Sequence, residues 1–427
     1  MPQEKNSVLK RKELDSNNTL LVLTAAALTL PGLLPHHSQA QSMQQTAPSV
    51  SQEKSVSYRY SQYSEEDIDA NVGLGDAQRY DISIHQLRFK SAIADNAEVT
   101  LDLVQESMSG ASPWYILAGP NEPIVVMSSA TIEEQRTDVQ ANFTTHFTSI
   151  SSSTALGYAT ENDYSSFRMS YSLSKALKDN NINLDFGVSG AQDFIEPVST
   201  DAYPTSIDRE RKTSGSVNFG FSSLIDRTSV ISSAISISFY DGYLSDPYKR
   251  VQVRNLPDEF TQGATATCPN GLCADSRPNQ RTQWAWTTRY RKSIKRTNSA
   301  LHMDYRYFAD DWEVQSHTVE FAWYQNLANS WQLVPELRWY TQTEAAFYQI
   351  YFDNPRNDGY YSNDYRLSPF EALSVKLKLS KFFEFGGLHL SYESYISEEL
   401  EGQTELASGS PTLVDFSHLT FGIDYKF

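Results

Sequence analysis

The sequence predicts an all-β fold, a transmembrane antiparallel β-barrel of about 16 strands with short periplasmic turns and long extracellular loops. Three observations predict it. Apolar and polar residues alternate in many segments of about 10 residues. The connections between these segments alternate between short and long, and the last segment closes on an aromatic residue, Phe427. The alternating segments have the length that a bilayer requires of tilted barrel strands, and alternating short and long connections are typical of outer-membrane barrels.

Strands are predicted wherever large apolar residues alternate with small or charged ones. In residues 373–380 leucine and valine alternate with serine and lysine, and in residues 301–307 leucine, methionine and tyrosine alternate with histidine, aspartate and arginine. Successive side chains of a strand point to opposite faces, so each segment has one apolar and one polar face. The predicted strands are 55–63, 80–93, 97–107, 134–147, 152–160, 164–175, 181–190, 210–222, 228–241, 281–292, 297–308, 313–325, 330–343, 366–380, 384–397 and 415–427.

The connections between these strands alternate in length. Every second one is short: 94–96, 148–151, 176–180, 223–227, 293–296, 326–329 and 381–383. Most of the others are long: 64–79, 108–133, 191–209, 242–280, 344–365 and 398–414. Two connections on the long side, 161–163 and 309–312, are short exceptions. Outer-membrane barrels have short periplasmic turns and long outer loops, so this parity favours that topology.

The composition is compatible with a barrel and excludes two other classes. No run of 18 or more apolar residues follows residue 40, which excludes a helical membrane protein. The net charge is −17, and residues 1–40 contain four basic and three acidic side chains, so the rest of the chain stands near −18. Nucleic acid is therefore not an expected partner, because its phosphates would be repelled. The 21 Phe, 25 Tyr and 7 Trp are enough for two interfacial girdles.

The N-terminal 40 residues have the pattern of a cleaved signal peptide. A basic cluster at residues 10–12 precedes an apolar run from Leu20 to Leu34, and small residues at Ser38 and Ala40 suit cleavage after Ala40. A short membrane anchor is the alternative, but the apolar run is too short to span easily. We expect residues 1–40 to be a signal peptide, 41–54 a flexible periplasmic lead-in and 55–427 the barrel.

Two cysteines, Cys268 and Cys273, flank the sequence Pro-Asn-Gly-Leu. A close pair of cysteines in an exported protein predicts a small disulfide-closed loop, and Pro-Asn-Gly favours a turn between them. A metal site would need more histidine or cysteine nearby than this region offers.

The last segment combines strand alternation with a terminal aromatic residue. Phe421, Tyr425 and Phe427 lie on its apolar face, and polar residues alternate with them. This pattern is similar to the C-terminal signal that the barrel assembly machinery of the outer membrane recognises. The expected location is therefore the cell outer membrane of a Gram-negative bacterium, with membrane lipid, lipopolysaccharide and that machinery as partners.

Several short motifs, in consistent order over nearly the whole mature chain, carry a resemblance to one family. They are Tyr-Arg-Tyr at 58–60, Ser-Gly-Ala-Ser-Pro at 109–113, Glu-Asn-Asp-Tyr-Ser at 161–165, Gly-Tyr-Leu-Ser-Asp-Pro-Tyr-Lys at 242–249, Tyr-Arg-Tyr at 305–307, Asp-Asp-Trp at 310–312, and 335–340. The sequence resembles a family of outer-membrane barrels catalogued as a domain of unknown function (family 3570). The resemblance implies the barrel and its membrane, and it implies no activity.

Charged residues on the polar faces are candidates for a channel lining. They are Arg59, Arg168, Asp185, His302, Asp304, Arg306, Glu336, Arg338, Lys376 and Lys378. A barrel of 16 strands is wide enough to hold water. These charges are expected either to line an aqueous channel or to brace the wall as ion pairs, and the sequence leaves both alternatives open.

A loop motif supplies the second set of candidates. Asp246, Lys249 and Arg250 place charges of both signs beside Tyr248 at the expected outer mouth. A loop folded into the barrel uses such charges to set pore size and charge preference. The alternative is that Asp-Pro and the neighbouring glycine only form turns.

The expected function is therefore a porin-like channel for small polar solutes. The alternative is a non-conducting structural or partner-binding barrel that serves an export or redox system of the envelope. No enzyme is expected, because no serine lies in a nucleophile motif and no phosphate loop or zinc helix occurs, and no cofactor or metal is expected. A soluble β-propeller or sandwich is the alternative fold, but it does not account for the terminal aromatic strand.

Overall fold

The computed structural model describes residues 54–68, 73–128, 132–177, 181–199, 204–263, 266–402 and 410–427. The expected signal peptide and nearly all of the expected lead-in lie outside these residues. None of the helices in the described ranges is long and apolar enough to cross a membrane.

Within the described residues, 16 antiparallel strands form one closed barrel, which confirms the predicted fold class. Each strand pairs with its neighbours in the sequence, and β1 pairs with β21 to close the barrel. The barrel strands are β1 (Ser55–Glu65), β3 (Asp81–Ala94), β4 (Ala97–Gly110), β7 (Ile132–His146), β8 (Ile150–Thr160), β9 (Tyr164–Leu177), β10 (Ile182–Ile195), β11 (Glu210–Asp226), β12 (Ser229–Gly242), β15 (Gln280–Ile294), β16 (Ser299–Asp310), β17 (Gln315–Asn326), β18 (Trp331–Gln342), β19 (Phe370–Phe383), β20 (Gly386–Glu399) and β21 (Phe416–Lys426).

The outer face of this barrel is apolar and exposed. Phe219 has an exposed fraction of 56% and Leu377 of 51%, although both lie in the middle of paired strands. Residues of the same parity on the other strands are also large and exposed, and Phe421, Tyr425 and Phe427 are among them. A soluble protein rarely exposes so wide an apolar surface, whereas a bilayer covers it. The alternation predicted from the sequence therefore places these side chains toward lipid.

Two glycines of the inner face make room for arginines. A Cβ atom on Gly422 would overlap Cδ of Arg59, and one on Gly157 would lie 2.9 Å from an Nη atom of Arg168. A larger residue at either position would require the arginine side chain to shift. Both arginines therefore have packed places on the inner wall.

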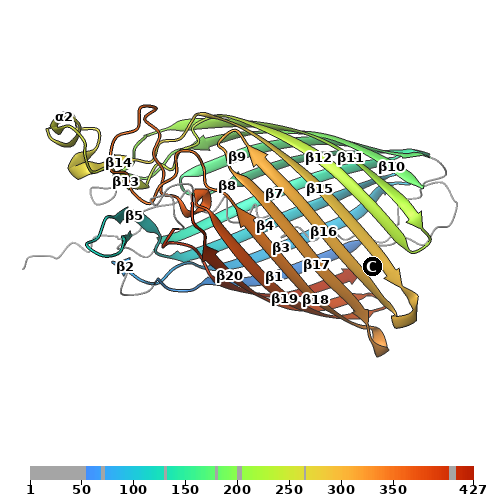
Figure 1. The fold of residues 1–427 in the computed structure, drawn as a ribbon. Coiled ribbons are helices and arrows are strands. Elements are labelled where there is room, and N and C mark those ends of the chain that lie inside the picture. Colours follow the sequence, from blue (N-terminus) through green and yellow to red (C-terminus); the bar gives the residue numbers. More distant parts are fainter. Residues whose placement is uncertain are drawn as a thin grey trace, which may run out of the picture.

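The longer connections meet at one end of the barrel, where Figure 1 shows β2, β5, β13, β14 and α2 gathered together. We call the described residues of connections 66–80, 111–131, 243–279, 311–314, 343–369 and 410–415 the cap. Its elements are β2 (Gly73–Leu74), β5 (Pro113–Leu117), β6 (Ile124–Met127), β13 (Arg250–Gln252), α2 (Asp258–Thr261), η1 (Pro269–Gly271), β14 (Leu272–Ala274) and η4 (Tyr365–Leu367). At the opposite end, short connections such as 95–96 and 384–385 join the strands.

The cap has apolar cores of its own. One core unites Val251 and Val253 with Phe352 and Tyr361, so connections 243–279 and 343–369 pack against each other. A second core, formed by Ile68, Ala111, Ile116, Val125, Met127 and Ile350, unites three connections. Burying these side chains favours one folded cap over independent loops.

The cap also reaches into the barrel. Tyr248 packs against Ile82, Ile84 and Met108 of β3 and β4. Because Leu87 of β3 is exposed on the outer face, the even-numbered residues of that strand point inward. Connection 243–279 therefore folds inward and contacts the inner wall.

Candidate functional site

All the predicted lining charges lie on the face opposite the exposed apolar side chains. Arg168, for example, lies between Phe167 and Met169, which are both exposed on the outer face. The same parity places the other predicted charges inward: Arg59, Asp185, His302, Asp304, Arg306, Glu336, Arg338, Lys376 and Lys378. The strand alternation seen in the sequence thus fixes the direction of each side chain.

Several of these charges form ion pairs along the wall. Arg59 lies 2.8 Å from Asp424, and Arg168 lies 2.6 Å from Asp138. Asp304 accepts hydrogen bonds from Arg291. Each of these part-exposed pairs contributes up to about 1 kcal/mol, so their main effect is to fix side-chain positions. Bracing of the wall accounts for these residues.

Other predicted charges make different contacts. Arg306 lies over the ring of Phe308 and Arg338 over the ring of Tyr340, each 5.5 Å from the ring centroid. Asp185 is exposed on the inner face of β10.

The loop motif lies inside the cap. Asp246 is 3% exposed and Lys249 is 4% exposed. The Asp246 carboxylate accepts hydrogen bonds from the backbone N–H groups of Tyr248 and Lys249, which forms the turn expected of an Asp-Pro sequence. Arg250 donates a hydrogen bond to the carbonyl of Pro204. The side chains of Asp246 and Lys249 are thus part of the packing of the cap.

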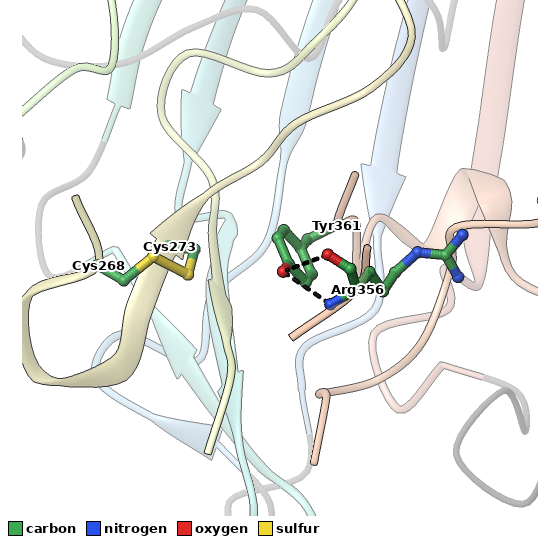
Figure 2. The surroundings of a disulfide bond; sticks show 4 residues. All are labelled: Cys268, Cys273, Arg356 and Tyr361. Atoms are coloured by element: carbon green, nitrogen blue, oxygen red, sulfur yellow. Dashed lines mark hydrogen bonds between the residues drawn. A yellow bond between two sulfur atoms is a disulfide. The ribbon is translucent and has the colours of Figure 1, made fainter. Parts of the chain in front are cut away.

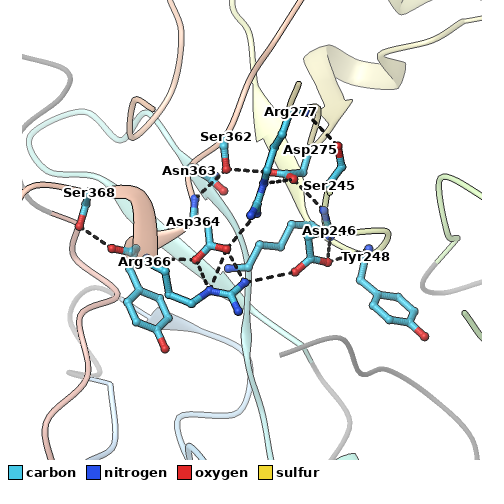
Figure 3. Close-up of polar contacts among 12 residues, drawn as sticks. Ser245, Asp246, Tyr248, Asp275, Arg277, Ser362, Asn363, Asp364, Arg366 and Ser368 are labelled. Atoms are coloured by element: carbon cyan, nitrogen blue, oxygen red, sulfur yellow. Dashed lines mark hydrogen bonds and ion pairs between the residues drawn. The ribbon is translucent and has the colours of Figure 1, made fainter. Parts of the chain in front are cut away.

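A buried ion network joins the two longest connections of the cap, as Figure 3 shows. Asp364 lies 2.9 Å from Arg277 and accepts hydrogen bonds from Arg366. Arg277 also pairs with Asp275 at 2.7 Å, and Asp275 accepts a hydrogen bond from Ser362. The side chains of Asp275 and Asp364 are fully buried. Removing one member would leave buried charges uncompensated, so the network holds the connections together as one unit.

The sequence interpretation missed this network. A signal for it exists, because Asp-Ser-Arg at 275–277 and Asp-Tyr-Arg at 364–366 repeat one Asp-X-Arg pattern near the ends of the two longest connections. Both tripeptides lie close to the start of a barrel strand, β15 or β19. Only the folded cap shows that the two tripeptides lie next to each other.

Burial and neighbouring charges shift the pKa values within this network. Burial raises the pKa of Asp364. The positive charges of Arg366, Lys249 and Arg277 lower this pKa by a larger amount, so it lies well below the ordinary 3.8. Burial also lowers the pKa of Lys249, although Asp364 and Asp246 oppose this. The carboxylate of Asp364 is therefore charged throughout the neutral range.

The low pKa of Asp364 predicts an acid limit for the cap. Because the folded pKa lies below the unfolded one, its stabilisation is complete above pH 3.8 and is lost as pH falls through the folded value. We expect amide hydrogen exchange in residues 343–369 to accelerate below about pH 3.8, beyond the intrinsic effect of pH. Asp364→Asn should not show this acid-dependent step, and a wild-type cap with unchanged protection at pH 2 would contradict the assignment.

The predicted disulfide joins Cys268 and Cys273 within the cap (Figure 2). Both cysteines are buried in the core that contains Val251 and Phe352. Nearby, the backbone N–H of Arg356 donates a hydrogen bond to the hydroxyl of Tyr361, which belongs to the same core. The disulfide thus closes a short loop within connection 243–279, and its cysteines share an apolar core with Phe352 and Tyr361 of connection 343–369.

Removing this crosslink is expected to loosen only the cap. A loop of this length is stabilised by about 2 kcal/mol through reduced disorder of the unfolded chain. A variant with Cys268→Ala and Cys273→Ala should be cleaved faster by trypsin near residue 254, while the barrel keeps its heat-modifiable mobility on gels. Equal cleavage of the variant and the wild-type protein would show that the disulfide adds nothing to cap stability.

Three carboxylates at the cap end of the barrel belong to residue types that can bind a metal ion. Oxygen atoms of Glu134, Glu161 and Asp163 lie within 4.8 Å of one another. Arg136 lies 3.5 Å from Glu161, and Tyr248 donates a hydrogen bond to Asp163. Arg136 thus supplies a positive charge to the group, and the hydrogen bond from Tyr248 joins the cap to the rim of the barrel.

Three comparisons with known proteins complete the description. The family model described as "Protein of unknown function (DUF3570)" matches residues 20–418. No curated protein matches the chain.

Among solved structures, CdiB from Acinetobacter baumannii is 7% identical with a TM-score of 0.47, and the match covers 88% of this chain and 60% of CdiB. A bacterial polysaccharide outer membrane secretin is 8% identical with a TM-score of 0.46, covering 88% and 99%. OccK1 (OpdK) of Pseudomonas aeruginosa is 8% identical with a TM-score of 0.39, covering 88% and 98%. The chain thus spans less than two thirds of CdiB.

Proposed function

Because the chain belongs to the family of proteins of unknown function DUF3570, whose description names no activity, we propose a function from the barrel itself. The protein is a channel for small polar solutes in the cell outer membrane, and the cap narrows its outer mouth. Lipid and lipopolysaccharide surround its apolar face, and the barrel assembly machinery inserts it.

The solvation of the inward-facing charges carries this proposal. The side chains of Arg88 and Arg289 point inward from β3 and β15, yet they are 41% and 44% exposed. Charged groups on a closed, dry interior face would be buried at a high cost in free energy. Exposure on a concave inner face therefore favours a lumen that holds water.

The cap supplies size selection. Tyr248 contacts the inner wall, and Phe308 of the inner wall packs against a core of the cap that contains Trp312 and Phe347. A folded segment at a channel mouth limits the solutes that enter. Small polar solutes, and not folded proteins or large polymers, suit such an entrance.

A non-conducting barrel that holds another envelope component is the second candidate. The buried cores and the ion network of the cap favour it, because a rigid cap presents one defined surface to a partner. This candidate needs no current through the lumen.

Single-channel recording of the purified protein in planar bilayers separates the two candidates. The channel proposal predicts discrete current steps in potassium chloride from the wild-type protein. If a correctly folded wild-type protein and a variant with a released cap, Asp364→Ala, are both silent, the channel proposal fails and the partner-binding barrel stands.

A further inference from the structure

Charged side chains of both signs that form no ion pair gather on four neighbouring strands of the inner wall. They are Arg306 on β16, Glu320 on β17, Glu336 and Arg338 on β18, and Lys378 on β19. Among the residues that the structure describes, none of these side chains has an opposite charge within 4.0 Å. Inward-facing Arg59, Arg88 and Arg168, in contrast, each pair with an aspartate.

Strand register orders these charges along the barrel. Arg306 lies opposite Thr318, nearest to the cap. Two residues further from the cap along β17, Glu320 lies opposite Arg338. Glu336 lies opposite Lys376, another step away. Arg306 therefore lies on the cap side of this stretch, Glu336 lies further from the cap than Arg338, and Lys378, opposite Val334, lies furthest from the cap.

Aromatic rings explain why the arginines do not pair with the nearby acids. Arg306 and Arg338 lie over Phe308 and Tyr340, which stand two residues further along the same faces, toward the cap. This contact draws both guanidinium groups toward the cap, and a cation over a ring is stabilised without a carboxylate.

The remaining neighbours are already paired. Asp304 is held by Arg291 and lies 3.8 Å from Arg289, and Lys376 lies 3.4 Å from Glu393. Glu320 and Arg338 are cross-strand neighbours, but no ion pair within 4.0 Å joins them. In the solvated lumen proposed above, groups in this arrangement are available to a solute.

We propose that this stretch of wall binds a small zwitterionic solute, such as a short peptide or an amino acid. Its carboxylate accepts hydrogen bonds from Arg306 and Arg338, and its ammonium group donates to Glu336. A simple anion leaves the two carboxylates without a partner, and a simple cation leaves the guanidinium groups without one, so a solute with both charges fits the stretch better than either. The proposal rests on the solvated lumen of the proposed channel and specifies the solute class.

Matched peptides test the proposal by calorimetry in detergent, without any need for current. The probes are alanylalanine, its N-acetyl derivative without the ammonium group, and its C-terminal amide without the carboxylate. The wild-type protein should bind alanylalanine about ten- to a hundredfold more tightly than either derivative, as expected for charge-assisted hydrogen bonds.

Variants assign each end of the solute. Arg338→Gln should remove the preference over the amide, and Glu336→Gln the preference over the N-acetyl derivative. A purely structural effect would weaken all three probes equally. Arg88→Gln, which removes one paired arginine of another part of the wall, is the matched control and should keep both preferences.

The outcomes distinguish this site from the channel. Selective binding of alanylalanine without current would contradict the channel proposal and support the binding site. Current with equal affinity for all three probes would contradict only the binding site. Gel mobility before and after heating confirms that each variant is folded. A folded Arg338→Gln variant with both preferences intact would overturn the proposal.

Discussion

Replacing Asp364 with alanine is expected to destabilise the cap by about 3–5 kcal/mol, the usual cost of leaving a buried ion pair without one partner. The change leaves Arg277 and Arg366 buried with too little negative charge around them. Hydrogen exchange in residues 243–279 and 343–369 should accelerate together, because one carboxylate joins both connections. In planar bilayers the released cap should give a larger single-channel current.

Asp358→Ala is the matched control for this experiment. Asp358 also pairs with an arginine, Arg356, on the same connection, but its side chain is 41% exposed. A surface pair contributes up to about 1 kcal/mol, so the control should leave exchange and current nearly unchanged. Equal effects of the two variants would mean that the buried network does not hold the cap.

Placing an arginine on the outer face should prevent stable assembly. Leu377 lies in the middle of β19 and points outward, so Leu377→Arg puts a charge near the middle of the bilayer. The expected cost is about 2–4 kcal/mol, and the measurement is the fraction of protein that shows folded, heat-modifiable mobility after insertion into lipid vesicles.

The control introduces the same residue on the inner face. Ser172 lies in the middle of β9, between Tyr171 and Leu173, which point outward. Its own side chain is exposed on the inner face. Ser172→Arg should assemble like the wild-type protein, because its charge meets water. If both variants fold equally well in lipid, the outer face is not a lipid-facing surface.

The barrel was predictable from the sequence because its signal is local. The alternation in residues 373–380 sets which side chains of β19 face lipid, and each predicted strand overlaps an observed one. Pairing between sequence neighbours then closes the barrel without any distant contact except that between β1 and β21. The inward direction of Arg168 and Arg338 follows from the same alternation.

The cap was not predictable, because its contacts join residues far apart in the sequence. Asp275 and Asp364 meet the same guanidinium group of Arg277 although 89 positions separate them in the numbering. Buried charges have no periodicity, and the turn residues around Asp246 look the same whether the loop is solvated or packed. The rings beneath Arg306 and Arg338 were visible in the sequence, but their role depends on which acids are already paired.

The most direct test of the whole account is the reactivity of cysteines placed at adjacent positions of one strand. Lys378 and Leu379 of β19 point to opposite faces, and both native cysteines are joined in a disulfide. In proteoliposomes with reagent on both sides, Lys378→Cys should react rapidly with a charged, water-soluble thiol reagent and Leu379→Cys should not. Rapid reaction of Leu379→Cys together with protection of Lys378→Cys would contradict a wet interior and a lipid-facing exterior.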